Sequence, residues 1–473
     1  MRKRFALAVS LTGVCLLAGC AVQPVSLSPI QSTLIASNWS YGEGTEATKT
    51  LRMSPDQWWA AWNDSTLSYL VETTLQNNTD IAQAQANLRS ARAALTSATS
   101  ALFPSATLGA DGSRNRRDNS STDSFGADAT AAWSLSFGGR DVSARRAAQA
   151  DAHASELSLE DTKSAMTSEV ALTYVNLRLA QIRLDIARKS VKSYEEAKNL
   201  TQWRYQAGLV SATDYEQANA QFENAKASIA SNMHNILQYE TALSRLTVLP
   251  LNRIQSLPAS DIPTPPSELA VSIPADVISL RPDIQAARES VRAAMENVRV
   301  AQADYFPTLS LSGTIGTTAA TVGALGASGT GIGALIGALS MPFLNWGDAV
   351  AATESQKAEL DRAQAQFTET LVGALEETEN ALSGIRTSAA KKLSLKVASE
   401  SSELAAQLAL QQYSSGLEDY QTVLTTQRSW LTAQDNEVSN KADWAIAHID
   451  LYRALGGGWV PENKLQEMGN GDE

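Results

Sequence analysis

Residue types that could carry out chemistry are few and scattered in this chain. Its 473 residues include three His and two Cys, and His153, His234 and His448 lie far apart, with no second ligand at metal-binding spacing. A zinc site needs several such ligands close together, so we expect no metal and no catalytic residues. The formal net charge is −12, which argues against nucleic acid as a partner because phosphate binding requires clustered basic side chains. An enzyme is therefore the least favoured class.

Cys20 is the residue best placed for covalent modification. The basic residues 2–4 precede the apolar stretch Phe5–Leu17, which has 13 residues. A membrane-spanning helix needs about 20, so this order is typical of a signal peptide. Leu17-Ala18-Gly19-Cys20 resembles the lipobox of bacterial lipoproteins, a class in which residues 1–19 are removed and Cys20 receives acyl chains such as palmitate. Ala21 is compatible with an outer-membrane location. An ordinary secretory peptide that contains a cysteine is the alternative.

The rest of the chain reads as two copies of one unit. Asp80-Ile81 recurs as Asp283-Ile284, and Tyr205-x-x-Gly208 recurs as Tyr413-x-x-Gly416. The order of these matches predicts a tandem duplication. Each copy reads as helix, two strands, long helix, turn and helix, and prolines gather between the copies.

The expected boundaries follow from this duplication. They are a signal peptide at 1–19, an N-terminal segment at 20–63, a first repeat at 64–249 with a β-hairpin at 103–137 and a tip at 208, a Pro-rich linker at 250–275, a second repeat at 276–455 with a β-hairpin at 306–343 and a tip at 416, and a tail at 456–473.

Two very long helices dominate the pattern. Asp141–Gln206 contains no Gly or Pro over 66 residues, and Asp348–Ser414 is interrupted only by two glycines. At 1.5 Å per residue each helix spans on the order of 100 Å. Two heptad series in 170–191 lie on opposite sides of the first helix, which predicts a neighbouring helix on each side, as in a ring. A multi-helix bundle is the alternative.

The strands are the weaker signal. Segments 103–113, 125–137, 306–318 and 330–343 are each long enough to cross a bilayer with tilt. Four strands cannot close a barrel, and an open edge in lipid leaves backbone groups unsatisfied. Membrane-spanning strands therefore require several copies of the chain, and three copies would supply twelve strands. Two soluble hairpins at the end of a bundle remain the alternative.

Several motifs carry a family resemblance over nearly the whole chain. They are Trp58-Trp59 with Trp62 and Leu67, Leu280-Arg281-Pro282-Asp283-Ile284, Tyr305-Phe306-Pro307-Thr308-Leu309-Ser310-Leu311, the two Tyr-x-x-Gly tips, and Leu455-Gly456-Gly457-Gly458-Trp459. With these motifs the chain resembles outer-membrane efflux proteins of the TolC type, in the lipoprotein (NodT-like) branch that serves RND multidrug pumps. The resemblance implies a mainly α fold with a small β part: a trimeric α-helical barrel joined to a 12-stranded transmembrane β-barrel, with four strands per chain.

The same resemblance implies a function and partners. The protein would be a lipid-anchored homotrimer in the outer membrane that passively conducts drugs and other amphiphiles outward. It would dock a periplasmic adaptor and, through it, an RND inner-membrane transporter, with no cofactor besides the lipid on Cys20. A channel for type I protein secretion is the main alternative, and a lipid-anchored periplasmic coiled-coil adaptor is a further one.

The tips at Gly208 and Gly416 are the expected functional site. The acidic residues there would favour cations in a narrow mouth; they are Asp214, Glu216, Glu418 and Asp419. Related channels carry constricting Asp residues where this chain has Thr422 and Thr425, which predicts a weaker cation block. The resemblance also implies that Asp214 hydrogen-bonds Tyr413 and holds the mouth shut. The alternative for Asp214 is a helix N-cap.

Overall fold

The computed structural model describes residues 55–118, 120–266, 281–341 and 346–457. The expected signal peptide, Cys20, part of the linker and nearly all of the tail lie outside these residues. Within the described chain the first repeat contains η2 (Pro55–Trp62), α2 (Ser65–Asn77), α3 (Thr79–Ser100), β1 (Ser105–Arg117), β2 (Ser120–Ser136), α4 (Arg140–Gln206) and α5 (Ala212–Thr247). After the short α6 (Leu251–Gln255), the second repeat contains α7 (Pro282–Ala303), β3 (Thr308–Ala319), η4 (Val322–Ala324), β4 (Gly331–Ser340), α8 (Trp346–Ser414) and α9 (Tyr420–Ala454).

The helix expected across 64–102 is interrupted at Asn78. Its backbone is extended (φ −62°, ψ 136°), and its side-chain oxygen accepts the N–H groups of Asp80 and Ile81 at 2.8 and 3.2 Å. The Nδ2 group donates to the carbonyl of Leu246 at 2.9 Å. Asn78 therefore ends α2, caps α3 and ties both to α5, a function that helical periodicity alone does not reveal.

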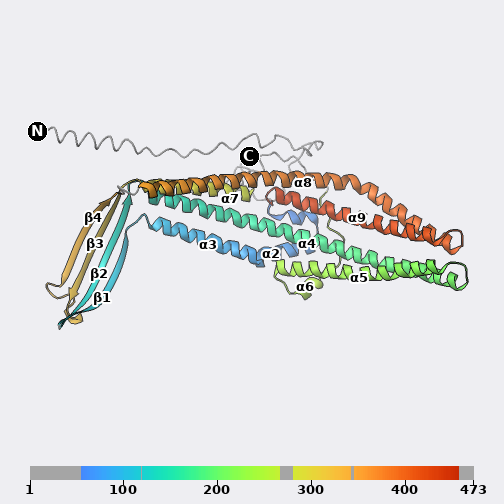
Figure 1. Ribbon diagram of the computed structural model, residues 1–473, viewed down its shortest axis with the longest axis horizontal. Helices are drawn as coiled ribbons and strands as arrows, with labels where there is room; N and C mark the ends of the chain where they lie inside the picture. The colour runs from blue at the N-terminus through green and yellow to red at the C-terminus, as the bar shows by residue number, and fades with distance from the viewer. Residues whose placement is uncertain (1–54, 119, 267–280, 342–345, 458–473) are drawn as a thin grey trace, which may run out of the picture. The chain divides into compact units, whose positions relative to one another are not determined.

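The four strands form one antiparallel sheet in the order β1-β2-β3-β4 (Figure 1). The segment 114–124, expected to be a loop, is mostly strand, because β1 and β2 pair out to Arg117 and Ser120. Polar side chains do not oppose strand structure when they face water or one another, and Arg114 and Asp123 form a cross-strand ion pair at 2.6 Å. The described residues thus give two long hairpins with one edge at β1 and one at β4.

The register separates an apolar face from a polar face. Cross-strand partners share a face, and Leu108 pairs with Ala129, which pairs with Ile315. The apolar face is uncovered within one chain, since Leu108 is 90% and Leu335 is 85% exposed. The opposite face of β1, β2 and β3 carries Ser, Thr and Asp side chains. This pattern is that of an outer-membrane strand, lipid-facing on one side only.

Contacts divide the chain into two units. Of the described residues, one unit contains 88–155 and 286–368, which hold the sheet and the adjoining parts of α3, α4, α7 and α8, and the other contains the described parts of 33–87, 156–285 and 369–473. The second unit has a core around the tryptophans of η2, where the Trp58 ring stacks on Tyr452 with centroids 4.9 Å apart. Its buried neighbours include Leu67, Leu70, Val170 and Tyr174. Among the described helices, none is both long and apolar enough to cross a membrane.

Candidate functional site

The two helical tips have the same backbone design. The α4 helix is followed by Gly208 at φ +70° and α8 by Gly416 at φ +78°, a left-handed conformation that glycine adopts without penalty. Leu209 N–H donates to the carbonyl of Arg204 at 2.8 Å, and Leu417 N–H donates to that of Gln412 at 2.9 Å. Each glycine thus ends its helix in a Schellman motif and lets the chain turn back. Figure 1 shows the two turns at the same end of α4, α5, α8 and α9.

The helices after the turns begin with different caps. Ser211 caps α5, and its side chain and the carboxylate of Asp214 form a capping box. Asp419 caps α9 by accepting Thr422 N–H at 2.8 Å. The backbone hydrogen bond from Thr422 holds the pKa of Asp419 below its usual value, so this carboxylate stays charged. Asp214 is not the N-cap itself, as the alternative interpretation had it, but lies three residues further along.

The expected hydrogen bond between Asp214 and Tyr413 is absent from the described structure. The Asp214 carboxylate accepts the Ser211 hydroxyl at 2.8 Å and the Ser211 N–H at 3.1 Å. The Tyr413 hydroxyl donates to Oγ1 of Thr201 at 3.2 Å, and its side chain is 1% exposed. The prediction is therefore wrong for this structure: each group has a nearer partner, one local to the α5 cap and the other buried on α4.

Arg204 makes the contact between tips that the sequence did not reveal. Its guanidinium lies 4.6 Å from the centroid of the Tyr413 ring, and its Nη1 donates to the Tyr413 carbonyl. A half-buried cation over an aromatic face is attractive, and the hydrogen bond is charge-assisted. Arg204 therefore joins α4 of the first hairpin to the end of α8 in the second. Its position just before the Tyr205-x-x-Gly208 motif was the one available signal.

An apolar cluster supports this contact. Tyr413, Tyr420, Val423 and Leu424 of the second hairpin pack with small residues of the first, Ala197 and Ala218 among them. Leu424 is 4% exposed, so it contributes to packing within the chain. Burial, and then the neighbouring Tyr194 and Tyr413, raise the pKa of Tyr420, which keeps this phenol neutral.

Most of the acidic side chains at the tips face solvent. Glu216, Glu418 and Asp419 are exposed and Asp214 is half-buried. Thr425 is exposed and donates to the carbonyl of Gln421 at 2.8 Å, whereas Thr422 is half-buried. The charged residues predicted from the sequence thus lie together at the tips, without an added carboxylate at the two threonine positions.

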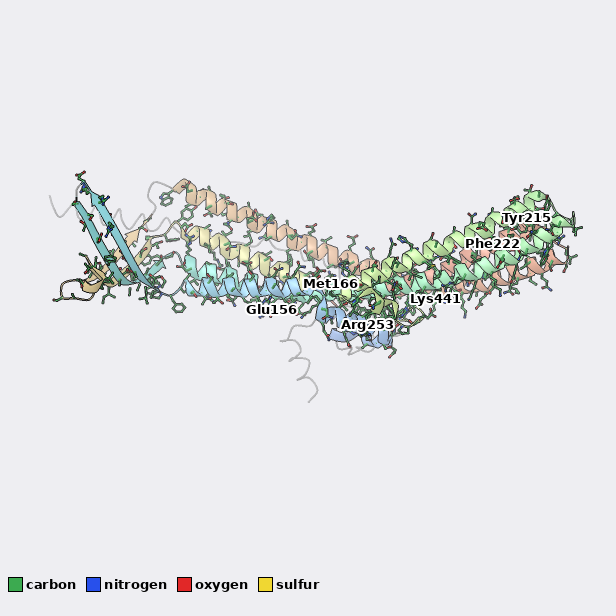
Figure 2. The ribbon with its side chains drawn as sticks, turned by 90° about the horizontal axis from the view of Figure 1, so that it is seen from below. Glu156, Met166, Tyr215, Phe222, Arg253 and Lys441 are labelled. Atoms are coloured by element: carbon green, nitrogen blue, oxygen red, sulfur yellow. The ribbon has the colours of Figure 1, made fainter. Side chains whose placement is uncertain are left out.

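A second cation–π contact lies within the first hairpin. The Lys198 ammonium is 4.3 Å from the ring centroid of Phe222, and Tyr205 stacks on Tyr215 with centroids 5.8 Å apart. Figure 2 shows Tyr215 and Phe222 on α5 near the tip. These contacts join α4 to α5 and do not reach the second hairpin.

Polar contacts also join the hairpins further from the tips. Gln427 donates to the Ser193 hydroxyl at 3.0 Å. Arg183 forms an ion pair with Asp435 at 2.7 Å and donates to Ser439 at 2.9 Å. Arg183 lies about 32 Å from Arg204 at the helical rise of 1.5 Å per residue. The hairpins are thus linked at several levels, with Arg204 and Tyr413 nearest the tips.

The Leu-Arg-Pro-Asp-Ile motif has a structural explanation away from the tips. Arg281 is 6% exposed; it donates to the carbonyl of Ala454 at 2.8 Å and forms ion pairs with Asp283 and Glu377 at 2.8 and 2.9 Å. Gly456 follows at φ +89°, where an added Cβ would lie 3.3 Å from Pro282. Arg281 therefore fastens the start of α7 to α8 and to the end of α9.

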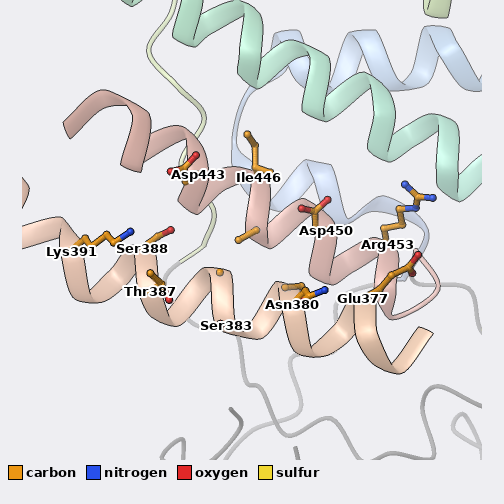
Figure 3. Close-up of a pocket in the computed structure, with 13 residues that line it drawn as sticks. Glu377, Asn380, Ser383, Thr387, Ser388, Lys391, Asp443, Ile446, Asp450 and Arg453 are labelled. Atoms are coloured by element: carbon orange, nitrogen blue, oxygen red, sulfur yellow. The ribbon is translucent and has the colours of Figure 1, made fainter. Parts of the chain in front are cut away.

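A cleft of about 610 Å³ lies beside this joint, between α8 and α9. Figure 3 shows Glu377, Asp443, Asp450, Lys391 and Arg453 along it. Burial raises the pKa of Asp450, and Arg453 opposes that shift. Among the described residues no three His, Cys, Asp or Glu side chains are grouped to hold a metal ion, and the mixed charges of the cleft indicate no single ligand.

Comparison with known proteins shows similarity to outer-membrane efflux proteins over most of the chain. The model of the family described as outer membrane efflux protein matches residues 70–247 and 273–457. The toluene efflux pump outer membrane protein TtgF of Pseudomonas putida is 29% identical over 94% of this chain and 95% of its own. Outer membrane protein OprJ of Pseudomonas aeruginosa is 29% identical over 96% and 95%.

Solved structures extend the comparison to the fold. The outer-membrane channel OprN has a TM-score of 0.82 and 28% identity, covering 93% of this chain and 100% of its own. The CmeC outer membrane channel of Campylobacter jejuni also has a TM-score of 0.82; at 24% identity over 95% of this chain and 97% of its own, it supports the fold alone.

Proposed function

Because the chain belongs to the outer membrane efflux protein family, we propose that it is the exit duct of a tripartite RND-type pump. In this role it conducts drugs and other amphiphiles from the periplasm outward and performs no reaction of its own. The observation that carries the proposal is the combination of a one-sided apolar sheet with two long helical hairpins joined at their tips. The sheet suits the lipid, and the hairpins suit a periplasmic conduit with a closable mouth.

The duct is proposed to be a homotrimer. The sheet has unpaired edges at β1 and β4, and in lipid such edges must pair with another strand. Four apolar residues of α8, each at least 47% exposed, also recur at near-heptad spacing: Leu393, Val397, Leu404 and Leu408. A second copy packed along α8 covers this seam while its sheet continues the strand order. Three copies give twelve strands, enough to enclose a lumen.

The mouth is proposed to be held by Arg204 and Tyr413. The six tips of a trimer gather at the periplasmic end, where Asp214, Glu216, Glu418 and Asp419 repeat three times. Their negative field favours cations, and Thr422 and Thr425 leave the constriction without additional carboxylates. Opening requires the two hairpins of a protomer to separate at the tips, which breaks the Arg204–Tyr413 contact before the more distant Arg183–Asp435 pair.

Lipid on Cys20 and two protein partners complete the proposal. Acyl chains on Cys20 anchor the chain in the outer membrane. A periplasmic adaptor connects the duct to an RND inner-membrane transporter, and this transporter supplies the energy for export. Three relatives are named for toluene efflux, antibiotic efflux and pyoverdine export, and these names support small amphiphiles as cargo. Mass spectrometry of the mature N-terminal peptide tests the lipid, because a Cys20→Ser variant must lose the added mass.

Conductance and drug susceptibility together test the duct. The purified protein in a planar bilayer should give small cation-selective currents. Expression with a compatible adaptor and pump in a bacterium that lacks its own outer-membrane channel should restore drug resistance. A folded trimer that gives neither current nor resistance contradicts the proposal. Export of a large protein substrate with no effect on drugs supports type I secretion instead.

A further inference from the structure

The outer end of the β1–β2 hairpin carries arginines on both faces of the sheet. Arg114 pairs with Asp123, Arg116 with Ser121 and Arg117 with Ser120. Because side chains alternate along a strand, Arg114 and Arg116 share the face of Leu108, whereas Arg117 lies on the polar face. All three are exposed. We propose that Arg116, next to Arg114 on the same face, binds the phosphate groups of lipid in the outer leaflet of the outer membrane.

The position of these arginines along the strand supports lipid phosphate as the partner. On the apolar face, Phe125 of β2 pairs with Gly112 and Trp133 pairs with Leu311. Phe125 and Trp133 are eight positions apart, which is about 27 Å along the strand, or about 20 Å across a bilayer at the usual tilt. Aromatic side chains at both ends of an apolar band are typical of membrane strands. Phe125 therefore marks the outer boundary of the hydrocarbon.

The arginines lie just beyond that boundary. Arg114 is two residues past Gly112, about 7 Å along the strand and about 5 Å outward at the usual tilt, and Arg116 is twice as far. This depth is the head-group layer, which long basic side chains reach while their stems remain against apolar atoms. The hairpin turn lies further out, because the helices of the same unit join the other ends of the strands.

The charge of Arg116 is left without a protein partner. Arg114 binds Asp123 through Nε and Nη2 at 2.6 and 2.7 Å, which fixes its guanidinium in place. No ion pair involves Arg116 in the part of the chain that the structure describes. The link between β3 and β4, residues 320–330, has no charged residue, so a neighbouring copy that pairs through β4 brings no carboxylate either. Each copy presents one uncompensated positive charge on its lipid-facing surface, and guanidinium groups bind phosphate strongly.

Lipid binding by the purified full-length trimer tests this inference without any pump partner. Native mass spectrometry measures the retention of bisphosphorylated lipid A and of the same lipid after removal of both phosphates. The wild type should prefer the phosphorylated lipid, and Arg116→Gln should weaken that binding by about five-fold per site. Arg116→Lys should recover most of it, and raised salt should weaken the wild-type preference.

Arg117→Gln is the matched control, because it removes the same charge one residue away on the opposite face. It should change binding less than two-fold. Equal retention of both lipids by the wild type overturns the inference, and so does an equal loss in the Arg116 and Arg117 variants. If Arg116→Gln fails to assemble, equal retention of the two lipids by the wild type still overturns the inference. A trimer that conducts but shows no phosphate preference leaves the duct standing and removes this site alone.

Discussion

Replacing Arg204 is the most direct perturbation of the proposed mouth. Arg204→Ala removes a half-buried cation–π contact, which contributes about 1 kcal/mol. It also removes a charged hydrogen bond to the Tyr413 carbonyl, which contributes about 2 kcal/mol. Together these amount to about 3 kcal/mol, or about a hundred-fold in a two-state equilibrium. If the contact exists only while the tips are together, the open fraction of the channel should rise by up to this factor.

Single-channel recording in planar bilayers measures the effect. Arg204→Ala should give larger or more frequent openings than wild type under the same salt and voltage. Arg204→Lys keeps the charge but loses the planar guanidinium, so its openings should be intermediate between those of wild type and Arg204→Ala. Tyr413→Phe loses only the hydrogen bond to Thr201, at about 1 kcal/mol, and should increase openings a few-fold.

Lys198→Ala is the matched control for this experiment. It removes a cation–π contact of the same kind, with Phe222, that lies within the first hairpin and does not join the two hairpins. Its currents should match those of wild type. Unchanged currents in a stable Arg204→Ala trimer would refute the proposed link, and equal opening by Lys198→Ala would show that general loosening of the tip is sufficient.

Three further changes test other parts of the structure. Gly416→Ala places a Cβ on a residue at φ +78° and should cost about 1 kcal/mol, which a lower thermal midpoint with an unchanged fold would show; an unchanged midpoint contradicts the need for glycine. Arg281→Met leaves Asp283 and Glu377 without their shared cation. Because the Glu377 side chain is 48% exposed, solvent screening reduces the loss, and stability should fall by about 2 kcal/mol. Chemical denaturation measures this fall, and Arg292→Met, which removes a side chain that is 58% exposed, should change stability little. Burial lowers the pKa of His448, with the Trp444 carbonyl opposing, so below the ordinary pKa the unfolded chain takes up a proton that the native chain does not. Stability should therefore fall as pH decreases from about 7 to 5, and His448→Gln should reduce that slope in thermal unfolding; an unchanged slope contradicts this explanation.

Period-two alternation in the sequence predicts the strands of the sheet but not which of their faces meets the lipid. Segments near 306–318 and 330–343 were expected to be strands, and β3 and β4 are found there. Ile332 and Ile336 alternate with Gly or Leu and suggest an apolar face, but the register pairs them with Gly316 and Ser312 on the polar face. The lipid-facing residues of β4 include Leu335 and Leu339 instead. Period-two alternation gives the spacing of a face, and only pairing with the next strand decides which face it is.

The local architecture of this protein can be read from its amino-acid sequence. Long spans without Pro, and with no Gly in the first and two in the second, predict the two long helices. The repeated Tyr-x-x-Gly predicts where they turn, because glycine adopts the left-handed turn conformation without penalty. Tertiary structure decided which tip residues meet. Tyr413 reaches Thr201 across 212 positions and Arg204 across 209, whereas Asp214 is satisfied three residues away at Ser211. A local cap such as that of Asp214 forms without the entropic cost of closing a long loop. Contacts between distant helices form only when the hairpins pack together, and a short sequence motif does not predict that packing.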